Sequence, residues 1–314
     1  MSEFPVEELR AWFPALYREA AGKTPIYLDG PGGTQVPQSV IDAISDYLIH
    51  CNANHGGDFS TSRHSDLLLR EAHQGMADFL NASAAEEIIF GANMTTLTFH
   101  LSRSIARTLS PGDEVLVTRL DHDANVRPWV LAARDSGAAV RFVDIHPEDC
   151  TLDLDDLRRK LSRRTRLLAI GAASNVVGTI NDVAALTALA HDVGAWVFVD
   201  AVHYAPHGVI DVQAWDCDFL ACSAYKFFGP HVGILYGKRR WLEELTPYKV
   251  RPCADTLPDR WMTGTQNHEG IVGVSAALEY LATVGEETGA AGQPMRERLR
   301  HGLASIRQQE KGLS

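Results

Sequence analysis

The sequence lacks the features that mark several classes of protein. It has no excess of basic residues, because 29 Lys and Arg against 40 Asp and Glu give a net charge of −11. Nucleic acids and anionic membranes select a basic surface, so this balance argues against both as partners. No apolar run approaches the length that spans a bilayer. Residues 1–10 also lack the basic-then-apolar pattern of a signal peptide.

Cysteine is scarce. The five cysteines are Cys51, Cys150, Cys217, Cys222 and Cys253. Their spacing fits no metal site, and their odd number suits reduced thiols in a cytosol. The sequence therefore predicts no metal centre and a cytoplasmic protein.

Hydrophobic residues make up 45% of the 314 residues and charged residues 22%, as in soluble globular proteins. Helical and strand patterns alternate, with glycine after the helices, which indicates βαβ units on a parallel sheet. Helices are expected at 37–49, 66–80, 94–108, 124–136, 153–161 and 182–193, and strands at 87–90, 114–118, 139–144, 166–170, 195–199 and 217–222.

Three further segments are expected outside this alternation. Residues 5–21 carry an amphipathic helical pattern, and residues 26–28 are predicted as a short strand. Residues 232–236 follow strand 217–222 too closely for a helical crossover, so they are predicted to pair with it antiparallel.

Lys226 and Asp200 are placed as a pyridoxal phosphate enzyme requires. Asp200 ends an apolar strand, and Lys226 comes shortly after the next strand. A lysine amine forms a Schiff base with the aldehyde of this cofactor, and a carboxylate keeps its pyridine nitrogen protonated. Because open α/β sheets bind ligands at the carboxyl ends of their strands, both side chains are expected in one crevice. Pyridoxal 5′-phosphate is therefore the predicted cofactor.

A phosphate site is expected at the next strand ends. Residues 93–96 (NMTT) open a helix after strand 87–90, so Met94 and Thr95 offer free N–H groups and a hydroxyl. Ser223, three residues before Lys226, is placed to donate to the same phosphate.

Other polar side chains are predicted around the pyridine ring. His122 follows strand 114–118, where an imidazole can lie over the ring and carry protons near neutral pH. Asn175 follows strand 166–170 and His203 follows Asp200, and both are placed to hydrogen-bond the phenolic oxygen.

These motifs together resemble the class V aminotransferase superfamily, in particular its cysteine desulfurase-like branch. The resemblance runs from about residue 27 to 285. The matching motifs are YLD at 27–29, NMTT at 93–96, DHDAN at 121–125, SNVVGT at 174–179, Asp200, SAYK at 223–226 and GTQN at 264–267. The resemblance implies fold type I: a large α/β domain with a mostly parallel sheet flanked by helices, followed by a small domain.

The resemblance also implies the roles of residues. The catalytic residues would be Lys226, Asp200 and His122, and further cofactor contacts would come from Met94, Thr95, Asn175, His203, Ser223, Tyr225 and Thr265. Thr265 would reach the phosphate bound by a neighbouring subunit. A homodimer with shared active sites is therefore expected.

The sequence departs from the family pattern at several positions. His203 stands where desulfurases usually have glutamine, and Tyr225 where they have a phosphate-binding histidine. A tyrosine hydroxyl can still donate to phosphate. The phosphate turn usually reads Gly-Thr-Thr, against residues 93–95 here, and His-Arg-Gly is usual at residues 55–57.

The family's nucleophilic cysteine and carboxylate-binding arginine lie in a C-terminal domain of about a hundred residues that this chain ends before reaching. Arg251, whose side chain suits bidentate carboxylate recognition, and His55 are the substrate-binding candidates within the chain. The predicted domains are an N-terminal helical segment (1–22), a cofactor-binding large domain (23–288) and the start of an incomplete small domain (289–314).

The leading functional hypothesis is a pyridoxal phosphate-dependent enzyme that acts on an amino acid, similar to cysteine desulfurases. An aminotransferase, an epimerase or a C–S β-lyase of the same family remains open, as does a cofactor-binding remnant that pairs with another chain. A nicotinamide dehydrogenase is excluded because the first strand is not followed by G-x-G-x-x-G. The sequence does not identify the amino acid or any sulfur acceptor.

Overall fold

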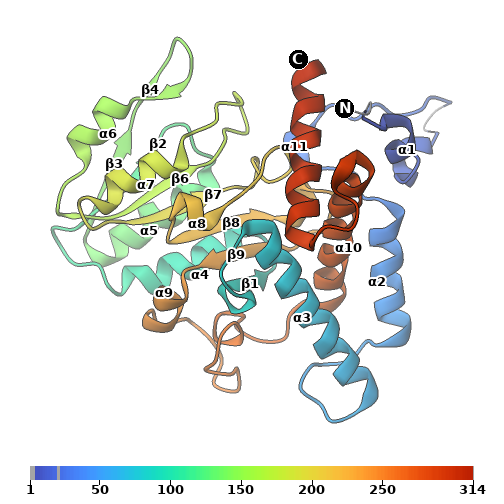
Figure 1. Ribbon diagram of the computed structural model, residues 1–314. Coiled ribbons are helices and arrows are strands. Elements are labelled where there is room, and N and C mark those ends of the chain that lie inside the picture. The colour runs from blue at the N-terminus through green and yellow to red at the C-terminus, as the bar shows by residue number, and fades with distance from the viewer. Residues whose placement is uncertain (1–3, 20–21, 314) are drawn as a thin grey trace.

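The computed structural model describes residues 4–19 and 22–313, in which helices cover both faces of a seven-stranded sheet (Figure 1). The strand order is β1-β9-β8-β7-β6-β2-β3. Its strands are β1 (Ile88–Gly91), β2 (Glu114–Thr118), β3 (Ala139–Val143), β6 (Thr165–Gly171), β7 (Trp196–Asp200), β8 (Phe219–Ser223) and β9 (Gly233–Gly237). All but β9 run parallel. The predicted α/β class with a mostly parallel sheet is confirmed.

The helices between β1 and β8 alternate with the strands of this sheet, and the other helices precede or follow them along the chain. They are α1 (Val6–Arg10), α2 (Gln38–His50), α3 (Ser60–Leu80), α4 (Met94–Ala106), α5 (Arg127–Ser136), α6 (Leu154–Lys160), α7 (Val183–His191), α8 (Val212–Trp215), α9 (Arg239–Glu244), α10 (His268–Gly285) and α11 (Met295–Leu313). None of the helices in the described part of the chain is long and apolar enough to cross a membrane.

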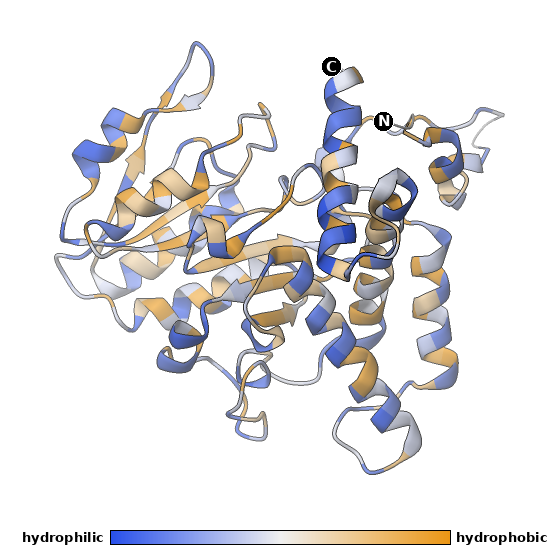
Figure 2. Cartoon of the chain, in the orientation of Figure 1, coloured by the Kyte–Doolittle hydropathy of each residue, from blue (hydrophilic) through white to orange (hydrophobic). Residues whose placement is uncertain are grey.

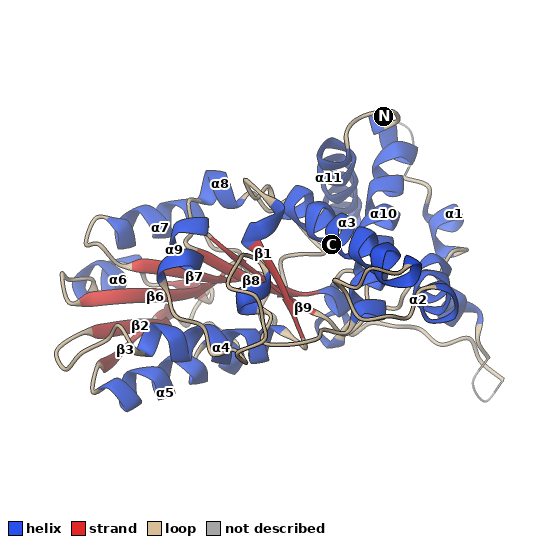
Figure 3. Cartoon of the chain, turned by 90° about the horizontal axis from the view of Figure 1, so that it is seen from below, coloured by secondary structure: helices blue, strands red, loops and turns tan. Residues whose placement is uncertain are grey.

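Successive strand residues face two separate hydrophobic cores. Leu168 and Ile170 of β6 join one core, with residues of α3, α7, α10 and α11. Leu167 and Ala169 join the other, with residues of α4 and α5. Figures 2 and 3 show the hydrophobic strands between the two helical layers. Because side chains alternate along a strand, burial on both faces explains the continuous apolar runs in the sequence.

Strand β9 is the antiparallel member of the sheet, as its short connection predicts. It pairs with β8 through Leu220↔Tyr236 and with β1 through Ile89↔Leu235. Because β9 lies between β8 and β1, the start of α4 lies beside it. A Cβ at Gly233 would lie 2.3 Å from the carbonyl carbon of Asn93. Glycine is therefore required where the two segments meet.

The N-terminal predictions are wrong in part. The helix expected over 5–21 is α1 followed by a 3₁₀ turn at Pro14–Tyr17, because the residue before a proline avoids the helical region and Phe13 is extended. Residues 26–28 form no strand, and Leu28 is 89% exposed. Residues 20–21 of the expected helix lie outside the described residues.

The last helix, α11, packs its apolar residues against the body of the protein. Leu299 and Leu303 of α11 are fully buried, and Met295 and Ile306 pack at the edge of the same core. Gly302 meets the backbone of α10, where a Cβ would lie 2.3 Å from the Leu281 carbonyl oxygen. The two helices therefore approach closely.

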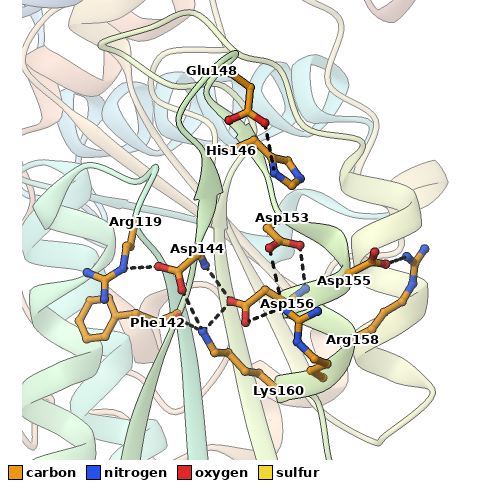
Figure 4. Close-up of polar contacts among 11 residues, drawn as sticks. Arg119, Phe142, Asp144, His146, Glu148, Asp153, Asp155, Asp156, Arg158 and Lys160 are labelled. Carbon is orange, nitrogen blue, oxygen red and sulfur yellow. Dashed lines mark hydrogen bonds and ion pairs between the residues drawn. The ribbon is translucent and has the colours of Figure 1, made fainter.

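A polar network closes the edge of the sheet beyond β3 (Figure 4). The Lys160 ammonium donates to the Phe142 carbonyl and to Asp156 Oδ2, both at 2.5 Å. Asp144 accepts from Arg119 and its N–H donates to Asp156. These bonds fasten α6 to the exposed edge strand. A hairpin of β4 (Ile145–His146) and β5 (Thr151–Leu152) connects β3 to α6 along the chain.

Candidate active site

One pocket gathers the polar residues at the carboxyl ends of five strands. Its lining comprises Pro31, Asn93, Met94, Thr95, Leu120, Asp121, His122, Ala124, Gly171, Ala173, Asn175, Asp200, Val202, His203, Ser223, Tyr225 and Lys226. The residues come from segments far apart in sequence because parallel strands end at one edge of the sheet. The structure thus brings together nine of the ten predicted cofactor contacts.

Lys226 is the last residue of a 3₁₀ turn, Ala224–Lys226, that follows β8. Thr34 holds this turn, because its N–H and hydroxyl donate to the Tyr225 carbonyl at 2.9 and 3.1 Å and its hydroxyl accepts from the Phe228 N–H at 2.8 Å. The Lys226 ammonium donates to the Pro31 carbonyl. The amine is therefore buried at the pocket wall, with one carbonyl partner from the N-terminal segment.

Asp200 ends β7 between its sheet neighbours Gly171 and Ala221. Only 8% of the residue is exposed, and its Oδ1 accepts from the Val202 N–H at 2.9 Å. Burial raises the pKa of this carboxyl to about 6, against the opposing effects of the Val202 hydrogen bond and of His122 and Lys226. A nearby cation would favour the ionised form.

Asp121 is a partly buried residue that brings a second carboxyl to the pocket, and its sequence pattern alone had indicated no role for it. Its Oδ2 accepts from the Thr118 hydroxyl at 2.7 Å. Burial raises the pKa of Asp121 to about 7, the Thr118 bond opposes this, and the Asp200 charge adds to it. The residue opens the DHDAN motif three residues after the end of β2, so its position near a strand end was the available signal.

His122 caps the short turn Asp123–Asn125. Its Nδ1 accepts from the Ala124 N–H at 3.1 Å, which leaves Nε2 to carry the proton in the neutral ring. The ring is exposed and lines the pocket. The ring is thus oriented by its own backbone, with Nε2 available to the pocket.

The start of α4 offers a place for an anion. The Met94 N–H donates to Ser223 Oγ at 3.0 Å, and the Thr96 N–H donates to Asn93 Oδ1 at 2.8 Å. The Thr95 N–H has no hydrogen-bond partner within the described part of the chain. An unpaired N–H at a helix N-terminus, beside two hydroxyls, suits a phosphate.

The remaining pocket residues enclose this region. The Tyr225 ring stacks on His231, with centroids 4.9 Å apart, and a Cβ at Gly33 would lie 2.8 Å from it. His203 lies beside Asp200 at the end of β7, and burial, His207 and Lys226 lower its pKa. Asn175 follows β6, the strand that pairs with β7 beside Asp200.

Three predicted site residues lie elsewhere. Thr265 and His55 line a separate groove of about 990 Å³ between α3 and the loop before α10. Arg251 is exposed and lines neither cavity. Cys253 lies in that groove too, where its thiol donates to the Asp259 carbonyl at 2.9 Å and burial raises its pKa. The described residues contain no group of His, Cys, Asp and Glu able to hold a metal.

These residues fit pyridoxal phosphate. A buried carboxylate suits a protonated pyridine nitrogen, a lysine amine suits an aldehyde, and the unpaired Thr95 N–H suits a phosphate oxygen. The fold and the site define a pyridoxal phosphate-dependent enzyme of the α/β class.

The chain belongs to the class V aminotransferase family, whose profile matches residues 26–311. A cysteine desulfurase of Pectobacterium atrosepticum is 37% identical over 300 residues, which cover 90% of this chain and 73% of that protein. A cysteine desulfurase of Serratia proteamaculans is 36% identical over 320 residues, or 97% of this chain and 78% of that protein.

Two solved structures have the same fold. The cysteine desulfurase CsdA of Escherichia coli superposes with a TM-score of 0.80 at 29% identity and covers 92% of this chain and 78% of its own. The apo cysteine desulfurase of Thermococcus onnurineus superposes with a TM-score of 0.84 at 26% identity, over 100% of this chain and 75% of its own.

Proposed function

We propose that this enzyme acts on cysteine and removes its sulfur, as its relatives named cysteine desulfurase do. The observation that supports this most is the assembly of Lys226, Asp200 and Ser223 in one pocket. Pyridoxal phosphate, when bound, supplies an electron sink for charge that develops at the α-carbon of an amino acid. The residues of the chain provide binding, orientation and proton transfer.

Each pocket residue takes a role in this proposal. The Lys226 amine would hold the cofactor and could carry a proton, and Asp200 would pair with the pyridine nitrogen. His122 would exchange protons through Nε2. Met94, Thr95, Ser223 and Tyr225 would hold the phosphate, and Asn175 and His203 the phenolic oxygen.

The second groove supports a homodimer with shared sites. Thr265 lies outside the pocket of its own chain, so it can reach a phosphate only in another copy. His55 lies in the same groove and Arg251 on the adjoining loop, and we assign both to the substrate carboxylate of the partner's site. We place the enzyme in the cytoplasm because all five of its cysteines are free thiols.

We also propose a division of the chain into three parts. Residues 23–288 would form the large domain and 289–314 the start of the small one, after the helical segment 1–22. The backbone turns sharply at Gly289, where φ is 128°, between α10 and α11.

A C–S β-lyase is the second candidate. Desulfuration needs an activated thiolate next to the cofactor. Within residues 4–19 and 22–313, no cysteine lines the Lys226 pocket, and Cys253 is bonded in the other groove. Elimination of sulfide requires no such thiol.

The products separate the two reactions. Transfer of sulfur to a thiol converts cysteine to alanine and leaves a persulfide. Elimination converts cysteine and water to pyruvate, ammonia and hydrogen sulfide. Alanine as the main product, formed equally by the wild type and Cys253→Ser, supports desulfuration through another thiol. Pyruvate in equal amount to sulfide would replace the proposal with the lyase.

A further inference from the structure

A row of three side chains joins the last helix to the pocket. His203 lines the pocket, and its ring packs against His207 with centroids 5.2 Å apart and planes at 60°. His207 Nδ1 contacts both carboxylate oxygens of Glu310, at 2.8 and 3.0 Å. Glu310 lies near the end of α11, which stands beside the loop that follows β7 (Figure 1).

The backbone after β7 places the two histidines together. The Ala205 N–H donates to the Ala201 carbonyl at 2.9 Å, and the His207 N–H donates to the Tyr204 carbonyl at 2.9 Å. This turn brings residues four apart onto one side. A second contact ties α11 to it, because Arg307 donates to the Tyr204 hydroxyl at 3.4 Å.

The charges around the row favour one arrangement of protons. Two imidazoles in contact resist double protonation, and a carboxylate in contact with one of them attracts the proton to that ring. Glu310 touches His207 and not His203. Burial lowers the pKa of His203. The charges of His207 and Lys226 lower it further, and the charge of Glu310 opposes this only from a distance.

We propose that Glu310 favours a proton on His207 over one on His203, and so keeps His203 neutral beside Lys226. A neutral imidazole can accept and donate hydrogen bonds, whereas a protonated one only donates and would add a second cation beside the amine. Glu310 and His207 are then positioning residues that act through His203. The inference builds on the cofactor site proposed above and extends it to α11.

Histidine NMR of the cofactor-free protein tests this directly. The chain has 13 histidines, and the variants His203→Gln and His207→Asn assign the two signals. In Glu310→Gln, the ring-nitrogen signals of His207 should change and the pKa of His203 should rise. Glu297→Gln is the matched control, because Glu297 lies on the same helix and pairs with Arg300 at 2.9 Å. It should leave the signals of both histidines unchanged.

The loaded enzyme provides the second measurement. The pH midpoint of its visible absorbance should move in Glu310→Gln and stay in Glu297→Gln, because the charge of His203 acts on Lys226. Unchanged histidine pKa values with lowered thermal stability would reduce Glu310 to a structural contact and overturn the inference. A shifted pKa of His203 with an unchanged pH midpoint of the absorbance would overturn the link between His203 and Lys226. Failure to bind cofactor would contradict the proposed function without affecting the titration.

Discussion

Ser223 Oγ accepts a hydrogen bond from the Met94 N–H at 3.0 Å, although 129 residues separate them. The bond joins the end of β8 to the start of α4. It therefore aligns a hydroxyl with the N–H groups that the helix leaves unpaired, which is the arrangement an anion requires.

Ser223→Ala should weaken retention of pyridoxal phosphate about tenfold, since one hydrogen bond to a charged group is lost. Equilibrium dialysis against free cofactor measures this. Ser275→Ala is the control, because the Ser275 hydroxyl is buried and has no hydrogen-bond partner among the residues that the structure describes. Equal affinities in the two variants would exclude Ser223 from the phosphate site.

Lys226→Ala should bind cofactor without attaching it covalently. Borohydride reduction followed by peptide mapping should label Lys226 in the wild type and no lysine in the variant. Lys238→Arg is the control, because it keeps the ion pair with Asp216 at the opposite end of the sheet. In this variant Lys226 should be labelled as in the wild type. Label on another lysine of the wild type would remove Lys226 from its proposed role.

The cofactor-free protein should lose stability as the pH rises from about 4 to about 7. Asp121 has a pKa of about 7 and Asp200 of about 6, both above the value of about 3.9 in unfolded chains. The folded state therefore binds more protons than the unfolded state in this range, and the free energy of unfolding decreases with pH.

Asp121→Asn should flatten this decrease, as measured by thermal unfolding at successive pH values. The exposed neighbour Asp123 provides the control, and Asp123→Asn should keep the wild-type slope. Identical slopes in both variants would mean that the Asp121 carboxyl is already ionised at low pH.

Gly171→Ala should disturb the pocket, because its Cβ would lie 2.4 Å from Asp121 Oδ1. The carboxyl must move toward solvent or toward Asp200, so we expect lower stability and at least tenfold weaker cofactor binding. Gly30→Ala places its Cβ in open space and should have neither effect. Unaltered binding in Gly171→Ala would show that the Asp121 side chain can move freely.

Mixing two inactive variants tests the shared sites. Lys226→Ala and Thr265→Ala should each form homodimers in sedimentation experiments, with impaired sites. If Thr265 serves the partner, a mixed dimer contains one site with both native residues. Covalent labelling should then recover to about half of the wild-type level in the mixed dimer, and to about a quarter in an equimolar mixture, of whose dimers about half are mixed. Recovery should be absent if each chain uses its own Thr265, and a monomer would contradict the proposal outright.

The sequence by itself determined the chemistry of the strand ends and the kind of sheet. Lys226, Asp200, His122 and Ser223 fall together because parallel strands end at one edge, so their order along the chain suffices. The antiparallel β9 also followed from sequence, since its connection to β8 is too short for a helix. Local pattern failed at residues 26–28, where an apolar run found no strand to pair with.

Only the tertiary structure decided which distant side chains meet. The division of predicted residues between the Lys226 pocket and the Thr265 groove depends on how the loop before α10 folds over α3. The contact of Glu310 with His207 spans 103 residues and requires α11 to pack beside the β7 loop. Such contacts arise from packing between helices and loops, whose relative positions are not fixed by the period of a strand or by its end.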